Sequence, residues 1–309
     1  MGKCAFVTQS YKADFEECRL LCESIDRFAP DLEHFIFVND EDYKLFTALD
    51  YGNHRVYRKS TVLPRYLVRL PFKMLGHHFH VSPFTIPVRE WIIQQICKLG
   101  VFEVIGDSYE AVFNVDSECV LMRPFSTDEW IRDGKYMMFR PENINEPSHD
   151  DYCNAYMKLL KVDPSRRDDV WRYNFMNSCT CFVRSNLEQL LEAIRRNSAM
   201  RSWKLALCNT YRFSENYTYG IFTNFRLGGR GHFIIDYRPI KMIDICSLSS
   251  GEDFSRAISE TMSDSRIAGA WLQKKDRKNL AGSYLDFNTI EKVVKEYWNS
   301  NYPLTSANG

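Results

Sequence analysis

The stretch Ala111–Val120 reads AVFNVDSECV. Its first five residues are mostly β-formers with almost no charge, which predicts a buried central strand. Asp116 and Glu118 follow at the C-terminal end of that strand, where ligands bind in open α/β sheets. Carboxylate oxygens at this place suggest a divalent cation that in turn holds phosphates. The alternative is a polar strand end, with both carboxylates in solvent or capping a helix.

Length, charge and cysteine usage narrow the class of protein. The chain has 309 residues, enough for one large α/β domain or two small ones. Lys plus Arg and Asp plus Glu both number 40, so the net charge is zero and no nucleic-acid partner is expected. The ten cysteines lie mainly at apolar positions, and Cys179 and Cys181 lack a second pair at zinc-ligand spacing. We therefore expect reduced, mostly buried thiols.

No secretory signal and no membrane-spanning apolar run is seen in the sequence. This pattern predicts a cytoplasmic protein. Peripheral contact with the inner face of the membrane stays open.

The opening of the chain predicts a parallel sheet. Residues 3–8 and 34–38 have strand character, and residues 14–28 carry apolar side chains at helical spacing. A strand, a helix and a strand within about forty residues form a βαβ unit, whose strands are parallel. Further strands are expected at 55–57, 111–115, 135–139, 179–183, 233–236 and 241–244, and further helices at 88–101, 150–161, 187–196, 202–208 and 289–298.

Residues 60–87 interrupt this alternation. They contain four prolines and the stretch Lys73–His80 (KMLGHHFH), which predicts a long binding loop or lid. Its three histidines, His77, His78 and His80, make a poor preformed metal site on a flexible loop. Pro87 suits the first position of the next helix.

The helix at 88–101 carries a polar group of side chains. Gln94, Gln95 and Lys98 are neighbours at helical spacing. They are either a solvated helix face or a polar patch beside the acidic motif, in which Lys98 neutralises a phosphate.

Four segments, taken together, resemble nucleotide-sugar glycosyltransferases of the GT-A fold, and within them a bacterial group of poorly assigned activity. The first is the opening strand and helix, which starts with VTQSY and covers residues 7–28. The other three are WIIQQICK at 91–98, VDSECVLMRPF at 115–125 and FSENYTYG at 213–220. The third segment is similar to the metal motif Asp-x-Asp, usually Asp-Ser-Asp. Here Glu118 replaces the last Asp, and its side chain is one methylene longer.

The resemblance implies an α/β, GT-A-like, Rossmann-type mixed sheet, mostly parallel and flanked by helices. It implies one catalytic domain over residues 1–245, with a nucleotide-binding half at 1–125 and an acceptor half at 126–245. Residues 246–309 are expected to add a C-terminal helical extension.

The same resemblance implies a donor site for a UDP- or GDP-linked sugar and a Mn²⁺ or Mg²⁺ ion. The metal ligands would be Asp116 and Glu118. The residues expected to bind the donor are Thr8, Ser10, Tyr11, Asp40, Gln95 and Lys98.

The implied activity is that of a hexosyltransferase-like glycosyltransferase, in which a sugar moves to a glycan or lipid-linked acceptor. Bacterial surface polysaccharide or lipopolysaccharide synthesis is the expected setting. The leaving nucleoside diphosphate gains negative charge, which a cation on Asp116 stabilises.

An acceptor hydroxyl needs a base if the reaction inverts, and Glu215 is the candidate. Its alternative role is to interact with the dipole of the helix that Ser214 caps. Trp91, Tyr217 and Tyr219 form either a platform for a sugar or part of the core.

Two other functions remain open. A sugar nucleotidyltransferase also uses a cation and paired acids, but it usually has a Gly-rich basic loop where this chain has Gln9–Ala13 (QSYKA). A non-catalytic nucleotide- or glycan-binding protein would fit if Glu118 marks a degraded metal site.

Overall fold

The computed structural model describes residues 2–74, 76–125, 127–142, 144–273 and 285–303. Its centre is a five-stranded sheet in the order β11-β7-β1-β2-β3. These strands are β1 (Lys3–Gln9), β2 (Glu33–Val38), β3 (His54–Arg58), β7 (Tyr109–Val115) and β11 (Cys179–Val183). The pairs β1–β2, β1–β7 and β2–β3 are parallel, and only β11 runs antiparallel to its neighbour. The predicted mixed, mostly parallel sheet is confirmed.

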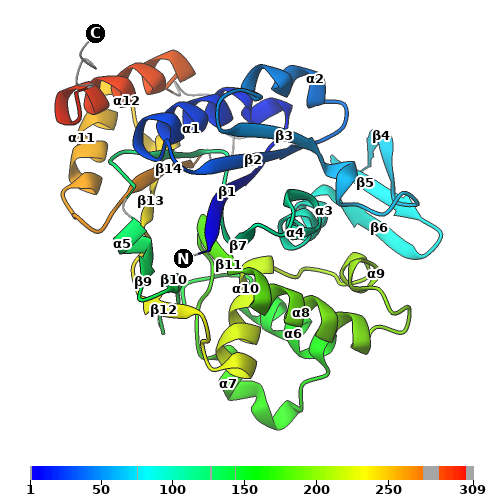
Figure 1. The fold of residues 1–309 in the computed structure, drawn as a ribbon. Helices are drawn as coiled ribbons and strands as arrows, with labels where there is room; N and C mark the ends of the chain where they lie inside the picture. Colours follow the sequence, from blue (N-terminus) through cyan, green and yellow to red (C-terminus); the bar gives the residue numbers. More distant parts are fainter. Residues whose placement is uncertain (1, 75, 126, 143, 274–284, 304–309) are drawn as a thin grey trace.

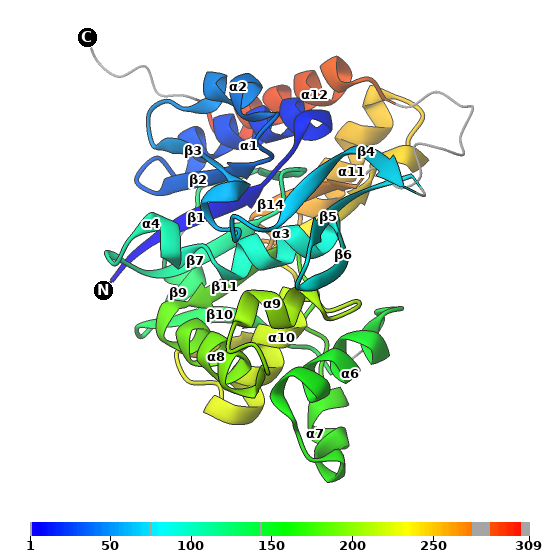
Figure 2. The same ribbon diagram turned by 90° about the vertical axis from the view of Figure 1, so that its right-hand side faces the viewer.

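Helices cover both faces of this sheet (Figures 1 and 2). On one side lie α1 and α12, and on the other α3, α6, α8 and α10. The helix bounds are α1 (Phe15–Phe28), α2 (Tyr43–Phe46), α3 (Glu90–Leu99), α4 (Phe102–Ile105), α5 (Thr127–Trp130), α6 (His149–Leu160), α7 (Arg167–Trp171), α8 (Arg184–Asn197), α9 (Trp203–Cys208), α10 (Glu215–Ile221), α11 (Gly251–Met262) and α12 (Phe287–Asn301).

Alternation along β1 divides the core between these two sides. Ala5 and Val7 face the cluster that includes α3, whereas Cys4 and Phe6 face the cluster that includes α1. Successive side chains of a strand point to opposite faces, so an apolar strand covered on both faces packs into two cores. The acidic stretch therefore follows a strand, β7, that is buried on both faces.

Three smaller sheets surround the central one. Their orders are β12-β10-β9, β13-β14-β8 and β4-β5-β6. Their strands are β4 (Val68–Met74), β5 (His77–Ser82), β6 (Thr85–Arg89), β8 (Cys119–Leu121), β9 (Ile131–Arg132), β10 (Lys135–Phe139), β12 (His232–Ile235), β13 (Ile240–Asp244) and β14 (Gly269–Gln273).

The prediction of a long loop at 60–87 is wrong, because from Val68 onward the segment contributes the strands of the antiparallel sheet β4-β5-β6 beside α3 (Figure 1). Its prolines obscured it in the sequence. Pro71 lies in β4 and Pro87 in β6, the two edge strands, and the pairing of β4 with β5 shifts register near Pro71. Edge strands and bulges are the places where a sheet tolerates proline. The histidines His77, His78 and His80 are thus on a strand, β5.

The predicted helix start at Pro87 is also wrong, since α3 begins at Glu90 after β6 ends at Arg89. The C-terminal segment contains α11 and α12 and also a strand, β14. That strand lies between β13 and β8 and pairs antiparallel with β8. The division into domains stays a prediction.

All ten cysteines are free thiols, and nine of them are buried, as predicted. Among the residues that the structure describes, no helix is both long enough and apolar enough to cross a membrane.

Candidate active site

The acidic motif occupies the turn that joins two sheets, between β7 and β8. The Asp116 N–H donates to the Ser178 carbonyl at 3.1 Å, and the Cys119 N–H donates to the Asp116 carbonyl at 3.0 Å. These bonds fix the turn at the carboxyl edge of the central sheet. The Asp116 side chain is 36% exposed, so its carboxylate can meet a ligand from solvent.

Lys98 on α3 joins this turn to α10. Its Nζ lies 3.0 Å from Asp116 Oδ1 and 2.9 Å from Glu215 Oε1. Burial lowers the pKa of Lys98, but the charges of Asp116 and Glu215 outweigh burial and raise that pKa above its usual range. The site therefore contains a permanently charged cation with only 13% of its side chain exposed.

Glu215 is held from two directions at the start of α10. Its N–H donates to Gln95 Oε1 at 3.1 Å, and its carboxylate, 4% exposed, pairs with Lys98. The predicted cap is confirmed, because Ser214 Oγ accepts the Tyr217 N–H at 3.4 Å. Gln95, Lys98, Asp116 and Glu215 are thus brought together from three parts of the sequence.

Glu118 points instead to the C-terminal segment. Its Oε2 accepts a hydrogen bond from Trp271 Nε1 at 3.2 Å, and its carbonyl accepts the Leu272 N–H at 2.9 Å. Trp271 lies on β14, far along the chain. Sequence reasoning missed it, although the short apolar run Gly269–Leu272 (GAWL) is a strand signal.

Four of the residues expected to bind the donor lie at the end of β1 or just after β1 and β2. The Thr8 hydroxyl is buried and lies 2.8 Å from His34 Nε2. The Ser10 N–H donates to the Phe37 carbonyl at 2.9 Å, Tyr11 is 41% exposed, and Asp40 Oδ1 accepts the Ser60 N–H at 3.3 Å. Their roles as donor ligands stay predictions.

Several polar side chains at this edge are buried without a hydrogen bond inside the described part of the chain. They include both polar atoms of Gln9, the Ser10 hydroxyl and both polar atoms of Asn114. Buried polar atoms normally have partners, so such a group fits a place where a ligand or ordered water supplies them.

A cavity of about 340 Å³ adjoins Asp40. Lys59, 2% exposed, reaches into this region, with its Nζ 2.8 Å from Asn39 Oδ1 and 3.3 Å from Glu90 Oε1. Arg69 also lines the cavity. The volume is within the range of small-molecule sites. No pattern in the sequence singles out Lys59 or Arg69 as part of it.

A second cavity, of about 560 Å³, lies between β5, β6, the start of α3, and α6. Trp91 lines it, is 39% exposed and stacks on Tyr152, with ring centroids 6.2 Å apart. Tyr217 and Tyr219 are at most 1% exposed and bond His149 and His232 through their hydroxyls. Of the three aromatic residues considered for a sugar platform, only Trp91 is placed to act as one.

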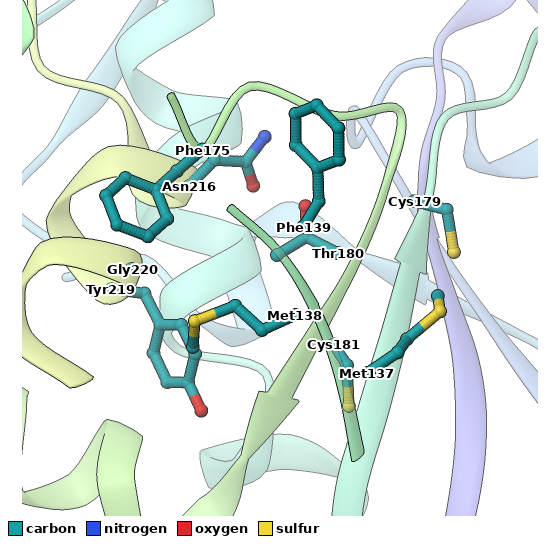
Figure 3. Close-up of a pocket in the computed structure, with 10 residues that line it drawn as sticks. All are labelled: Met137, Met138, Phe139, Phe175, Cys179, Thr180, Cys181, Asn216, Tyr219 and Gly220. Carbon is teal, nitrogen blue, oxygen red and sulfur yellow. The ribbon is translucent and has the colours of Figure 1, made fainter. Parts of the chain in front are cut away.

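The small cavity in Figure 3 lies between β10, β11 and α10. It measures about 10 Å³ and is lined mainly by apolar side chains, among them Met138 and Phe175. That volume is at the lower limit for one water molecule. It is a packing void behind the site and has no room for a sugar or a nucleotide.

Comparison with known proteins gives one family and several solved structures. The profile of a family described as "Family of unknown function (DUF6492)" matches residues 5–233. No curated protein matches the chain.

Three solved structures illustrate the structural likeness. The apo-form glycosyltransferase GlyE of Streptococcus pneumoniae TIGR4 is 10% identical with a TM-score of 0.42, and the match covers 96% of this chain and 63% of that one. Galactosyltransferase LgtC, solved with donor and acceptor sugar analogs, is 11% identical with a TM-score of 0.44, over 96% and 99%. Mouse xyloside xylosyltransferase 1 is 8% identical with a TM-score of 0.43, over 87% and 97%. The chain thus spans less than two thirds of the length of GlyE.

Proposed function

The chain belongs to the family of unknown function DUF6492, and we propose that it is a glycosyltransferase that moves a sugar from a nucleoside-diphosphate sugar to a glycan or lipid-linked acceptor. The proposal rests on the ion-paired group at the carboxyl edge of the sheet. Lys98 lies within 3.0 Å of Asp116 and of Glu215, in a region where ligands of α/β sheets bind.

The charge of Lys98 suits the chemistry of the leaving group. A nucleoside diphosphate gains negative charge as its bond to the sugar breaks, and fixed positive charge close to it lowers that barrier. Burial keeps the ammonium in a low-dielectric place, where its attraction for phosphate is stronger than in water. Asp116 and Glu215 hold it there before the substrate arrives.

The acidic turn offers two carboxylates to a divalent cation. Asp116 is partly exposed and uses Oδ1 toward Lys98, while Glu118 is oriented by an indole N–H. A ligating carboxylate is commonly held by such an outer hydrogen bond. Asp116 and Glu118 would therefore hold Mn²⁺ or Mg²⁺, and when bound this ion would supply Lewis-acid stabilisation of the diphosphate.

The two cavities suggest how the substrates are divided. The one beside Asp40, with Lys59 and Arg69 in its wall, is proposed to take the nucleoside end of a UDP- or GDP-linked donor. The larger one, with Trp91 exposed, is proposed to take the acceptor, because sugars bind with an apolar face on aromatic rings.

Glu215 has two roles that fit its position. As a positioning residue it keeps Lys98 aimed at the diphosphate. As a general base, its carboxylate must give up the ion pair with Lys98 and accept the proton of the acceptor hydroxyl. Glu215→Gln separates them, since loss of the acidic limb of the pH–rate profile, where the rate rises as the base ionises, supports a base, and an unchanged profile with weaker donor binding supports positioning.

The test is a panel of common nucleotide sugars, each incubated with the protein and Mn²⁺ and followed for slow hydrolysis. We expect one donor to be hydrolysed, with loss of hydrolysis in Asp116→Ala and retention in Asp31→Ala, which removes an exposed carboxylate away from the site. If no nucleotide sugar binds with or without Mn²⁺, the proposal is wrong.

Two other outcomes would support the alternatives. Release of pyrophosphate from an NTP and a sugar phosphate would indicate a nucleotidyltransferase. Tight nucleotide binding without turnover of donor would indicate a binding protein. Bacterial surface polysaccharide and lipopolysaccharide precursors, made on the cytoplasmic side of the membrane, are the acceptors to test first.

A further inference from the structure

A cluster of metal-ligand side chains lies under α1, away from the candidate active site. Cys22 on α1, His34 at the start of β2 and His54 at the start of β3 present one ligand atom each, and all three atoms lie within 4.8 Å of one another. Each of the three residues is fully buried. Figure 1 shows α1 lying over β2 and β3, so the cluster joins a helix to the outer part of the sheet.

The distances inside the cluster are close to those of a tetrahedral metal site. Cys22 Sγ lies 3.8 Å from His34 Nδ1, and His34 Nδ1 lies 3.0 Å from His54 Nδ1. With Zn–S of about 2.3 Å and Zn–N of about 2.0–2.1 Å, ligand atoms of a tetrahedral site are about 3.6 Å apart for sulfur and nitrogen and about 3.3 Å for two nitrogens. These two separations differ from the tetrahedral values by a few tenths of an ångström, and Cys22 and His54 present their ligand atoms within 4.8 Å of each other.

The far nitrogen of each imidazole has the outer partner that a metal-bound histidine needs. His54 Nε2 lies 3.0 Å from Asp26 Oδ1, and His34 Nε2 lies 2.8 Å from the Thr8 hydroxyl. Histidine ligands usually donate their second N–H to a carboxylate or another oxygen, which fixes the ring and its tautomer. Both Nδ1 atoms, in contrast, point to the same place as the Cys22 thiol.

A second buried thiol, Cys18, lies one helical turn earlier, outside the group of three converging ligand atoms. Cys18 is fully buried, and its thiol is hydrogen-bonded to that of Cys22. Residues four apart on a helix lie on the same face, so Cys18 lies beside Cys22 on the side of α1 that faces the cluster. Two thiolates and two imidazoles are a donor set typical of structural zinc.

We propose that Cys22, His34 and His54, with Cys18 as fourth ligand, bind a structural zinc ion that fastens α1 to β2 and β3. This site is separate from the proposed catalytic cation, whose ligands are carboxylate oxygens. Through Thr8 the zinc site supports the end of β1, from which the proposed donor-binding residues follow.

The competing arrangement is a chain of hydrogen bonds without metal. In it the Thr8 hydroxyl donates to His34 Nε2, His34 Nδ1–H donates to His54 Nδ1, and His54 Nε2–H donates to Asp26. Zinc binding moves the His34 proton from Nδ1 to Nε2 and releases the thiol proton of each cysteine that ligates. The number of protons released therefore reports how many cysteines join.

The experiment uses the full chain, stripped with a chelator under reducing conditions and titrated with Zn²⁺ against a chromogenic competitor. We expect about one Zn²⁺ per chain, a higher melting temperature, and about two protons released per ion with both cysteines as ligands. A Co²⁺-loaded sample should show thiolate-to-metal charge-transfer absorption. About one proton released would overturn the role of Cys18.

Variants then test the assignment. Cys22→Ser should abolish tight binding, and Asp26→Asn should weaken it roughly 10–100-fold by removing an outer partner. The matched control is Cys153→Ser, because Cys153 is a buried thiol 3.7 Å from the imidazole of His149 without a second histidine in the cluster. The Cys153→Ser variant should still bind zinc as the unmodified chain does.

Absence of stoichiometric zinc, with no shift in melting temperature and no cobalt–thiolate absorption in the unmodified chain, would overturn the proposal. That result does not depend on whether the variants fold. It would leave the hydrogen-bonded chain as the structure of this cluster.

Discussion

Replacing Lys98 with methionine tests whether the ion-paired group is held by charge. Methionine keeps an unbranched apolar chain of similar length but removes the ammonium. The two carboxylates it leaves are in different surroundings, since Glu215 is 4% exposed and Asp116 is 36% exposed. Asp116 can be hydrated again, so its share of the loss is at most about 1 kcal/mol. Glu215 becomes an uncompensated buried charge.

Removing one partner of a buried pair costs about 3–5 kcal/mol. We expect Lys98→Met to lower the free energy of unfolding by about 3 kcal/mol at pH 7, at the lower end of that range. The pKa of Lys98 is raised in the folded state, so its contribution is complete below the unfolded pKa of about 10.4 and is lost only as pH rises through the folded value. Titration of Lys98 itself therefore adds no pH dependence to the difference between the two proteins from about pH 6 to pH 9.

A double-mutant cycle with Glu215→Gln isolates the pair. The double variant has no buried unpaired charge, so its destabilisation should be smaller than the sum of the two single values by about 2 kcal/mol. Urea unfolding, followed by circular dichroism for all four proteins, gives the four free energies. Additivity within about 0.5 kcal/mol would show that Lys98 and Glu215 are not coupled and would refute the assignment.

Three further predictions follow from single contacts. Gly220→Ala should lower the free energy of unfolding by about 1–3 kcal/mol, because its new Cβ would lie 2.2 Å from the Phe175 ring, and an unchanged urea midpoint would contradict this packing. Trp271→Phe should weaken Mn²⁺ activation of donor hydrolysis roughly 10–100-fold by removing the indole N–H that orients the Glu118 carboxylate, with near-normal stability as the check that the fold is intact. Burial lowers the pKa of His232 to about 4, so its stabilising effect is complete above about pH 6.5 and is lost as the pH falls from 6.5 to 4. The urea midpoint should therefore fall less across this pH window in His232→Gln than in the unmodified protein. Parallel curves for the two proteins would exclude this histidine as the source of the pH dependence.

The elements that the sequence predicts well are those with a local period. β1, α1 and β2 each agree with the expected bounds to within one residue, since buried strands and amphipathic helices show their pattern in a few neighbouring positions. The sheet β4-β5-β6 was missed because most of its side chains are partly or fully exposed, which removes the apolar alternation. Two of its prolines lie on edge strands, where proline does not exclude a strand.

The site follows a similar division. Lys98, Gln95 and Asp116 could be grouped because the end of a strand and the preceding helix share one edge of a parallel sheet. The cluster of Cys22, His34 and His54 could not be found this way. Each residue occupies an inward position on its own element, and only the packing of α1 on β2 and β3 shows that the three side chains converge.

The glutamate in the acidic motif is explained by the strand that pairs with it. β14 lies antiparallel to β8, so Trp271 pairs with Cys119 and its indole reaches back to Glu118. An aspartate, one methylene shorter, would be too far from that indole without a movement of the turn. The Glu118 carbonyl is fixed in the same ladder by the Leu272 N–H. The longer side chain therefore couples the acidic turn to the C-terminal segment through β14. This reading requires β14 and the acidic turn to be stabilised together, because one residue, Glu118, supplies a hydrogen bond to the strand through its backbone and another through its carboxylate.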